Sequence, residues 1–233
     1  MSGFSELMKS NLKVFTAIPN LATDDRYNDY LPSILTHLKR QETTVNMMTP
    51  YITPPYDGTF SPGMPDRLYA YVDRMNHIIE KFVSTDATNV FFNDGDVEIP
   101  PNTIETLIKH NVDVVSGVYP WHNFDESRAM MFGRTDKDNP CGNLRPRDWD
   151  YLKGRVVGSK DEPWAGGTGC LLVSRRVFEQ HQPLRFNKDN DCGMDVLFWK
   201  RCQDAGFSAR VDARIVCGHL PRFRLSEIDE WLT

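Results

Sequence analysis

The sequence predicts an α/β fold in one domain, with a mostly parallel central sheet flanked by helices. Strand-like and helix-like segments alternate over the first 120 residues, as they do in successive βαβ units. The 233 residues are enough for one substantial core, and 40% hydrophobic with 25% charged residues is an ordinary composition for a globular protein. The sequence has no internal repeat, so a single domain over residues 1–233 is the simplest arrangement.

The expected elements of the first half follow from apolar patterns. The segment LKVFTAIPN (12–20) is a short apolar run that ends in a Pro-Asn turn, which predicts a strand. Apolar residues at helical spacing predict helices over 26–40 and 66–82. Proline and glycine exclude regular structure over 52–65. Further strands are expected at 43–51, 90–93 and 112–120.

The second half is less regular. Asn102 and Glu105, directly after two prolines, resemble a capping box and predict the start of a helix. Residues 121–163 are polar and rich in Arg, Asp, Gly and Pro, so loops and short strands are expected there. The remaining expected elements are a strand at 170–173 with a short helix after it, a helix over 194–207 that ends near Gly206, a strand over 209–220 and a short C-terminal helix.

Composition and charge argue against several classes of protein. A net charge of −5 disfavours an electrostatic grip on nucleic acid, although basic residues cluster at 145–155 and 210–224. No apolar run approaches the roughly 18–20 residues that span a bilayer, and the N-terminus lacks a signal peptide's apolar centre, so we expect a cytoplasmic protein. Five cysteines without a CxxC pair indicate neither a disulfide framework nor a zinc ribbon. Zinc ligation by Cys192, Cys217 and His219 is an alternative with weak spacing, and free thiols are the simpler interpretation.

One strand ends on two carboxylates. The segment VFFN (90–93) suits a buried strand, yet Asp94, Gly95 and Asp96 follow it directly. Charge at the end of a buried strand is costly unless something positive lies there. Ligands of parallel α/β sheets bind beyond the carboxyl ends of the strands, and two hard oxygen ligands suit Mg²⁺ or Mn²⁺ when phosphates complete the shell. A plain turn is the alternative, because Asp and Gly both favour turns.

Four motifs in order along the chain resemble the GT-A class of nucleotide-sugar glycosyltransferases, most closely its family 2-like members. They are the Asp-Gly-Asp after a strand, WAGGTGCLLVSRRVF (164–178), DCGMDVLFWKRCQDAGF (191–207) and VCGHL (216–220). The resemblance runs over about residues 12–220 and implies the Rossmann-like GT-A fold. It also implies a nucleotide-binding half over about 12–120 and an acceptor and catalytic half over about 121–233.

Carried over position by position, the resemblance implies a metal and donor site. Asp96 would ligate Mn²⁺ or Mg²⁺, and His219 would complete the protein ligands. Asp94 would contact the metal through water, or the ribose of the donor. Arg67 and Arg74 lie near one another on the 66–82 helix, which the resemblance places beside the donor; a solvated helix face is the alternative. The implied donor-binding residues are Thr16, Ile18, Pro19, Arg67, Arg74, Asp94 and Gly95.

The resemblance also implies a catalytic and acceptor side. Asp195 matches the second acid of a Glu-Asp pair, where an inverting enzyme keeps its general base, but Met194 stands in the place of the usual Glu. Asp191 is an alternative base, and helix capping is an alternative role for Asp195. The implied acceptor-side residues are Trp164, Gly166, Gly167 and Trp121, with His122 beside the last.

The resulting hypothesis is a metal-dependent glycosyltransferase. It would transfer a sugar from a nucleoside-diphosphate sugar, with UDP or GDP as the carrier, to an acceptor hydroxyl. A nucleotidyltransferase is one alternative, although the stretch IPNLATDD lacks the glycine-rich basic signature of that class. A non-catalytic sugar-binding relative is the other, and the presence of all the implied acids argues against it. The acceptor stays open between a protein, a glycan and a modified nucleic-acid base, as does the stereochemical outcome.

Overall fold

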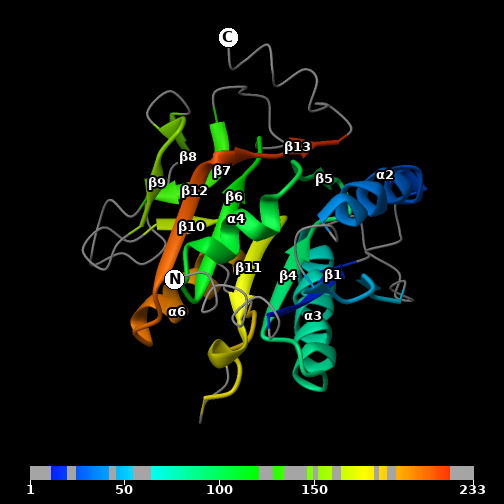
Figure 1. Cartoon of the computed structure of the whole chain (residues 1–233), viewed down its shortest axis with the longest axis horizontal. Helices are drawn as coiled ribbons and strands as arrows, with labels where there is room; N and C mark the ends of the chain where they lie inside the picture. The colour runs from blue at the N-terminus through cyan, green and yellow to red at the C-terminus, as the bar shows by residue number, and fades with distance from the viewer. Residues whose placement is uncertain are drawn as a thin grey trace, which may run out of the picture.

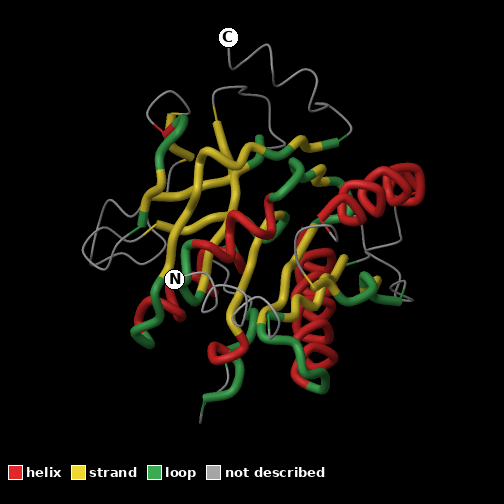
Figure 2. Tube along the Cα trace, in the orientation of Figure 1, coloured by secondary structure: helices red, strands yellow, loops and turns green. Residues whose placement is uncertain are grey.

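The predicted α/β fold is confirmed, with an eight-stranded, mostly parallel sheet at its centre and helices on both faces (Figure 1 and Figure 2). This computed structural model describes residues 12–19, 25–41, 46–54, 64–120, 128–133, 146–148, 152–158, 164–180, 184–187 and 193–220. The predicted C-terminal helix lies outside these residues. None of the described helices combines the length and the apolar character that a transmembrane span requires.

The strand order of the central sheet is β2-β1-β4-β11-β6-β12-β9, with β3 also paired to β1. Its strands are β1 (Lys13–Ile18), β2 (Asn46–Met47), β3 (Tyr51–Ile52), β4 (Asn89–Asn93), β6 (Val114–Val118), β9 (Val156–Val157), β11 (Cys170–Ser174) and β12 (Ala209–Val216). β9 and β11 run against all the other strands. Because β11 lies between β4 and β6, the start of β11 meets the carboxyl ends of both neighbours.

The single strand predicted over 43–51 is two short strands, β2 and β3, which pair with successive parts of β1. Two small sheets complete the fold. One joins β10 (Trp164–Gly166), β7 (Arg128–Gly133) and β8 (Pro146–Asp148), and the other joins β13 (Gly218–His219) and β5 (Val97–Glu98). The β13–β5 pair lies directly beyond the carboxyl end of β4. It therefore brings the VCGHL motif (216–220) next to the Asp-Gly-Asp turn.

The helices cover the central sheet in pairs. They are α2 (Asp25–Gln41), α3 (Met64–Val83), α4 (Thr103–Lys109) and α6 (Met194–Asp204), with the 3₁₀ turn η1 (Arg175–Val177) after β11. Apolar residues of α3 and α6 pack into one core cluster on one face, and those of α2 and α4 pack into a second cluster on the other. The helices predicted over 26–40, 66–82 and 194–207 are therefore confirmed, and the first two bury the apolar stripes that predicted them.

The start of α4 corrects one prediction. Asn102 occupies the N-cap position, but its backbone is left-handed, with φ 62°, and its side chain makes no capping hydrogen bond. The cap comes from α2 instead: Gln41 Oε1 accepts from the Ile104 backbone N–H at 3.2 Å, while Gln41 Nε2 donates to the Pro100 carbonyl at 2.7 Å. A long-range contact thus satisfies a helix end that local sequence alone would leave open.

The C-terminal end of α3 is closed by one guanidinium from across the sheet. Arg175, directly after β11, donates to the α3 carbonyls of Phe82 at 3.1 Å and Val83 at 3.3 Å. It also donates to the carbonyls of Thr85 at 2.7 Å and Ala87 at 2.5 Å in the loop after the helix. It also lies over the Phe82 ring at 4.7 Å from the centroid. A cation that donates to the last carbonyls of a helix satisfies orphan acceptors and the negative end of the helix dipole.

We expect Arg175→Ala to lower the free energy of unfolding by about 2–3 kcal/mol, because several carbonyls lose a charged donor. Arg175→Lys should recover little of this, since an ammonium group cannot reach the same carbonyls in a fork. Lys109→Ala is the control: Lys109 pairs with Glu105 on the exposed side of α4, and its loss should stay within about 0.5 kcal/mol. Urea denaturation of the three variants measures these differences. An Arg175→Ala protein as stable as the Lys109 variant would contradict the capping role.

Candidate functional site

The two carboxylates of the Asp-Gly-Asp motif lie in a tight turn at the carboxyl end of β4. The Val97 N–H donates to the Asp94 carbonyl at 3.1 Å, which closes the turn. The fully buried Asn93 holds its shape, because Asn93 Nδ2 donates to the carbonyls of Asp94 at 2.7 Å and Val97 at 2.8 Å. Both acids therefore lie directly beyond a buried strand, as the sequence predicted.

Asp96 and His219 face one another across the β13–β5 pair. His219 pairs with Val97, and its Nε2 lies 3.6 Å from Asp96 Oδ2. Its Nδ1 lies 2.7 Å from the Pro120 carbonyl, which can only accept, so Nδ1 carries a proton and donates. In the neutral ring, the lone pair of Nε2 then points at a carboxylate oxygen. A proton on Nε2 or a cation between the two atoms would be attracted to the carboxylate.

The protonation of His219 reflects this arrangement. Burial lowers the pKa of the imidazole, but the Asp96 carboxylate, the Pro120 carbonyl and the charge of Asp94 together outweigh burial and raise the pKa above its ordinary value. A proton on Nε2 and a metal ion at the same place satisfy the same two atoms. Fixing Nδ1 on a backbone carbonyl is also the usual means by which proteins orient a metal-binding histidine.

Asp94 is held differently from Asp96. Its Oδ1 accepts a hydrogen bond from the Tyr71 hydroxyl on α3. Burial is the main influence on this carboxyl group, and the charge of Asp96 adds to it, so the pKa of Asp94 rises to about 7. The charges of His219 and Asp195 also act on Asp94, which places all four groups in one electrostatic neighbourhood.

The described residues supply two candidate metal ligands rather than three. No group of three His, Cys, Asp or Glu side chains within the described ranges could hold one ion together. The next acid, Glu98, is turned toward α2, where its Oε1 accepts from Ser33 Oγ at 2.5 Å and lies 3.6 Å from His37 Nε2. Asp96 and His219 fit a dication nonetheless, because atoms 3.6 Å apart can both bond to one ion at roughly 2.0–2.2 Å.

Asp195 lies in the first turn of α6, as predicted, and its Oδ1 accepts from the Val196 N–H at 2.8 Å. Burial raises the pKa of this carboxyl group above its usual range. Met194, in the place of the usual Glu, is only 5% exposed and belongs to the apolar core cluster of α3 and α6. A glutamate at that position would be a buried charge in an apolar cluster, whereas a methionine packs there without that cost.

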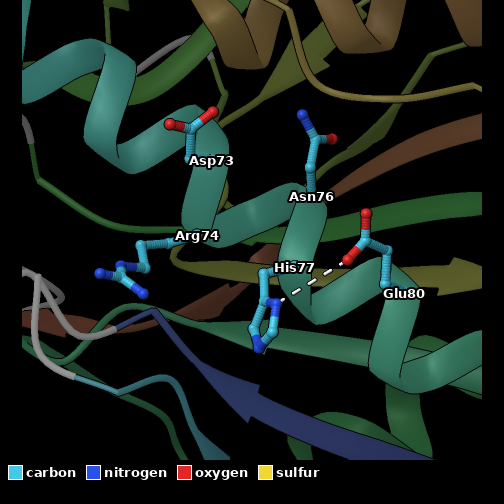
Figure 3. Close-up of a pocket in the computed structure, with 5 residues that line it drawn as sticks. All are labelled: Asp73, Arg74, Asn76, His77 and Glu80. Carbon is cyan, nitrogen blue, oxygen red and sulfur yellow. Dashed lines mark ion pairs between the residues drawn. The ribbon is translucent and has the colours of Figure 1, made fainter.

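The predicted donor residues lie on two elements that border the acidic turn. Thr16, Ile18 and Pro19, at the end of β1, are all buried. Arg74 lies on α3, one turn beyond Tyr71, and lines a pocket of about 370 Å³ together with Asp73, Asn76, His77 and Glu80 (Figure 3). Asp73 and Asn76 extend from one side of the helix and Arg74 and His77 from another (Figure 3). The side chain of Arg67 is not among those described.

The described acceptor residues that the resemblance implies lie in β10 and in the turn between β10 and β11, and they are tightly packed. Trp164 is 3% exposed and joins the core cluster on the α3 and α6 face. A Cβ at Gly166 would lie 2.0 Å from Ser116 Oγ, and one at Gly167 would lie 2.1 Å from the Tyr119 hydroxyl, so both positions exclude any side chain. Their roles toward an acceptor stay predictions. Three further residues that the sequence singled out, Trp121, His122 and Asp191, lie outside the described residues.

Two tyrosines of the site were not predicted. Tyr71 counted as one of the apolar positions of the α3 pattern, and Tyr119 as the end of a strand. Both lie beside the acidic turn, Tyr71 on Asp94 and Tyr119 edge-on against His219, with ring centroids 5.2 Å apart. A tyrosine within an apolar stripe is a weak signal, because it usually indicates packing.

Comparison with known proteins bears on the fold. No protein-family model matches the sequence, and no curated protein sequence does either. The crystal structure of A197 from STIV superimposes with a TM-score of 0.54 at 14% identity, over 90% of this chain and 86% of that one. S. aureus TarS 1-349 gives 0.48 at 13% identity, over 88% and 60% of the two chains. CMP:2-keto-3-deoxy-manno-octonic acid synthetase complexed with CTP gives 0.48 at 14%, over 94% and 96%. At 14% identity, the superposition on A197 supports the overall α/β fold alone.

The raised pKa of Asp94 predicts a stability gain on neutralising this residue. An unfolded Asp titrates near 3.9, so between about pH 4 and pH 7 the folded protein keeps a proton that the unfolded chain has lost. Stability therefore falls as pH rises through that window. Asp94→Asn removes this loss, and in EDTA it should raise the free energy of unfolding by roughly 1–3 kcal/mol at pH 8 and leave it unchanged at pH 4. Urea denaturation at both pH values measures the gain; equal stability of both proteins at pH 8 would refute it.

Proposed function

We propose that this chain is a metal-dependent glycosyltransferase that moves a sugar from a nucleoside-diphosphate sugar to an acceptor hydroxyl. The observation that carries the proposal is the Asp96–His219 pair, held 3.6 Å apart with the imidazole fixed by Pro120 at the carboxyl edge of the sheet. That edge is where α/β sheets bind their ligands. The motif order along the sequence and the GT-A-like fold support the same assignment.

Asp96 and His219 are the residues that would hold Mn²⁺ or Mg²⁺. When bound, the ion supplies positive charge that stabilises the leaving diphosphate without proton transfer. Two protein ligands leave most of the shell to the diphosphate and to water, as is usual for Mg²⁺ sites. Arg74, within one helical turn of Tyr71, is placed to add positive charge on the donor side.

Asp195 is the residue that we assign as general base in an inverting reaction. Its carboxylate lies near enough to the acidic turn for its charge to act on Asp94. Burial makes it a stronger base than an exposed Asp, since its raised pKa lies closer to working pH. It would take the proton from the acceptor hydroxyl as that oxygen attacks the anomeric carbon.

The proposal predicts metal-dependent nucleotide binding that requires Asp96. We expect UDP or GDP to bind more tightly with Mn²⁺ than with EDTA, and Asp96→Ala to abolish the difference, because it removes the carboxylate that lies 3.6 Å from His219 Nε2. Isothermal titration calorimetry measures both affinities. Asp86→Ala is the matched control, since Asp86 precedes the same strand at its other end and its side chain is 74% exposed. Equal Mn²⁺ dependence in wild type and the Asp96 variant would remove the metal assignment.

A donor screen tests the reaction itself. Wild-type protein should hydrolyse or transfer from at least one UDP-, GDP- or TDP-sugar in the presence of Mn²⁺ and release the nucleoside diphosphate. No turnover and no metal-dependent binding with any of them would count decisively against the glycosyltransferase. Release of pyrophosphate from a nucleoside triphosphate and a sugar phosphate would indicate a nucleotidyltransferase instead.

Asp195→Ala should separate donor binding from transfer. We expect it to leave Mn²⁺-dependent nucleotide binding within twofold of wild type while lowering kcat for transfer by about 10²–10⁴, the usual contribution of a general base. Asp204→Ala, at the other end of α6 with a side chain 51% exposed, is the control and should retain full transfer. Transfer unaffected by Asp195→Ala would move the base assignment elsewhere.

A further inference from the structure

The start of β11 is tied to the acidic turn through the hydroxyl of Tyr71. This hydroxyl donates to Asp94 Oδ1 and lies 3.3 Å from Thr168 Oγ1. Thr168 is 4% exposed and lies between two glycines of the turn that leads into β11. One oxygen atom on α3 therefore contacts both a carboxylate of the donor side and a hydroxyl of the glycine turn.

Tyr119 ties the same turn to the histidine. The Gly169 N–H donates to the Tyr119 hydroxyl at 3.0 Å, and the ring meets His219 edge-on at an interplanar angle of 82°. Tyr119 also lies in the field of three carboxylates, because Asp94, Asp195 and Asp96 all act on its pKa. The residue is thus central to the site, although no motif of the sequence includes it.

The Gly167–Gly169 turn packs closely against Asp94 and Tyr119. A Cβ at Gly169 would lie 2.9 Å from Asp94 Oδ2 and 3.0 Å from Tyr119 Cζ. Burial keeps both tyrosine hydroxyls protonated, since it raises the pKa of Tyr71 and of Tyr119 well above the ordinary value. Each hydroxyl therefore remains a hydrogen-bonding group over the whole working range of pH.

We infer that Tyr71 and Tyr119 are positioning residues that act as a clamp on the Gly167–Gly169 turn. The Tyr71 hydroxyl links this turn to Asp94, and the Tyr119 hydroxyl links it to the ring that packs against His219. This tyrosine clamp joins the half of the chain that carries the acidic turn to the half that carries the glycine turn. The inference rests on the proposed function in so far as Asp94 and His219 serve donor binding. Neither tyrosine needs to touch the substrate; both act by fixing the groups that would.

The test deletes one oxygen at a time. Tyr71→Phe and Tyr119→Phe keep the rings in the core but remove the hydroxyls, and Tyr51→Phe is the matched control. Tyr51 also bonds a residue of α3, with its hydroxyl 2.8 Å from His77 Nε2, but it lies away from the glycine turn. We expect Mn²⁺–UDP affinity to fall about 10–100-fold in each test variant, the usual effect of losing an orienting partner, and to change less than twofold in the control. Calorimetry with UDP and electron paramagnetic resonance with Mn²⁺ alone measure these affinities.

A double variant distinguishes a clamp from two separate packing defects. If both hydroxyls hold one turn, the combined loss in Tyr71→Phe/Tyr119→Phe should be clearly smaller than the product of the single losses. Independent packing defects would instead multiply. Affinities equal to wild type in both single variants, or strictly multiplicative losses, would overturn the inference.

Amide hydrogen exchange of the metal-free protein separates this inference from the proposed function. Losing the Tyr119 hydroxyl removes the acceptor of the Gly169 N–H, and losing the Tyr71 hydroxyl releases Thr168, so both variants should speed Gly169 exchange at least tenfold over the Tyr51 control. A wild-type protein that binds neither Mn²⁺ nor UDP would refute the proposed function. Gly169 exchange would still decide the clamp in that case, and unchanged exchange in both variants would refute it.

Discussion

The direction of β11 is the constraint on which the site depends. A strand that ran parallel to β4 and β6 would bring its end, and the arginines that come after it, to the carboxyl edge of the sheet. Because β11 is antiparallel to both neighbours, its beginning lies there instead. The glycine turn before Cys170 thus meets Asp94 from β4 and Tyr119 from the end of β6. At the other end of the strand, Arg175 donates to the last carbonyls of α3. One reversed strand therefore both closes a helix and completes the site.

The carboxyl groups at the two edges of the sheet have pKa values shifted in opposite directions. At the amino-terminal edge, the carboxyl group of Asp113 is 3% exposed and accepts hydrogen bonds from Arg176 and from Ser208, and these outweigh its burial and lower its pKa. That acid is ionised and satisfied, so it contributes to stability at neutral pH. At the carboxyl edge, burial raises the pKa of both Asp94 and Asp195. Raised values mean that the folded chain alone does not satisfy these charges. Such an arrangement is typical of sites where a ligand supplies the missing interaction.

The sequence predicted what local patterns determine. The apolar stripes of α2 and α3 and the buried strand before Asp94 lie where the sequence predicted them, because such patterns are encoded within a few turns of the chain. It did not predict the reversal of β11, since a short apolar run has no direction until its neighbours are known. The prediction of the α4 cap failed for a similar reason. Gln41, which caps the helix, is distant in sequence, whereas Asn102 lies at the N-cap position. Tyr71 was hidden in an apolar stripe, and only the fold reveals that its hydroxyl reaches Asp94.

The first turn of α6 serves the core and the site at once. Met194 and Val196 flank Asp195 in sequence and are 5% and 6% exposed in the cluster beneath the sheet. A Cβ at Gly193 would lie 2.7 Å from Asp195 Oδ1, so the glycine before the helix lets the chain pass close over that carboxylate. Apolar neighbours and a close backbone both keep water from Asp195, which is why burial dominates its pKa.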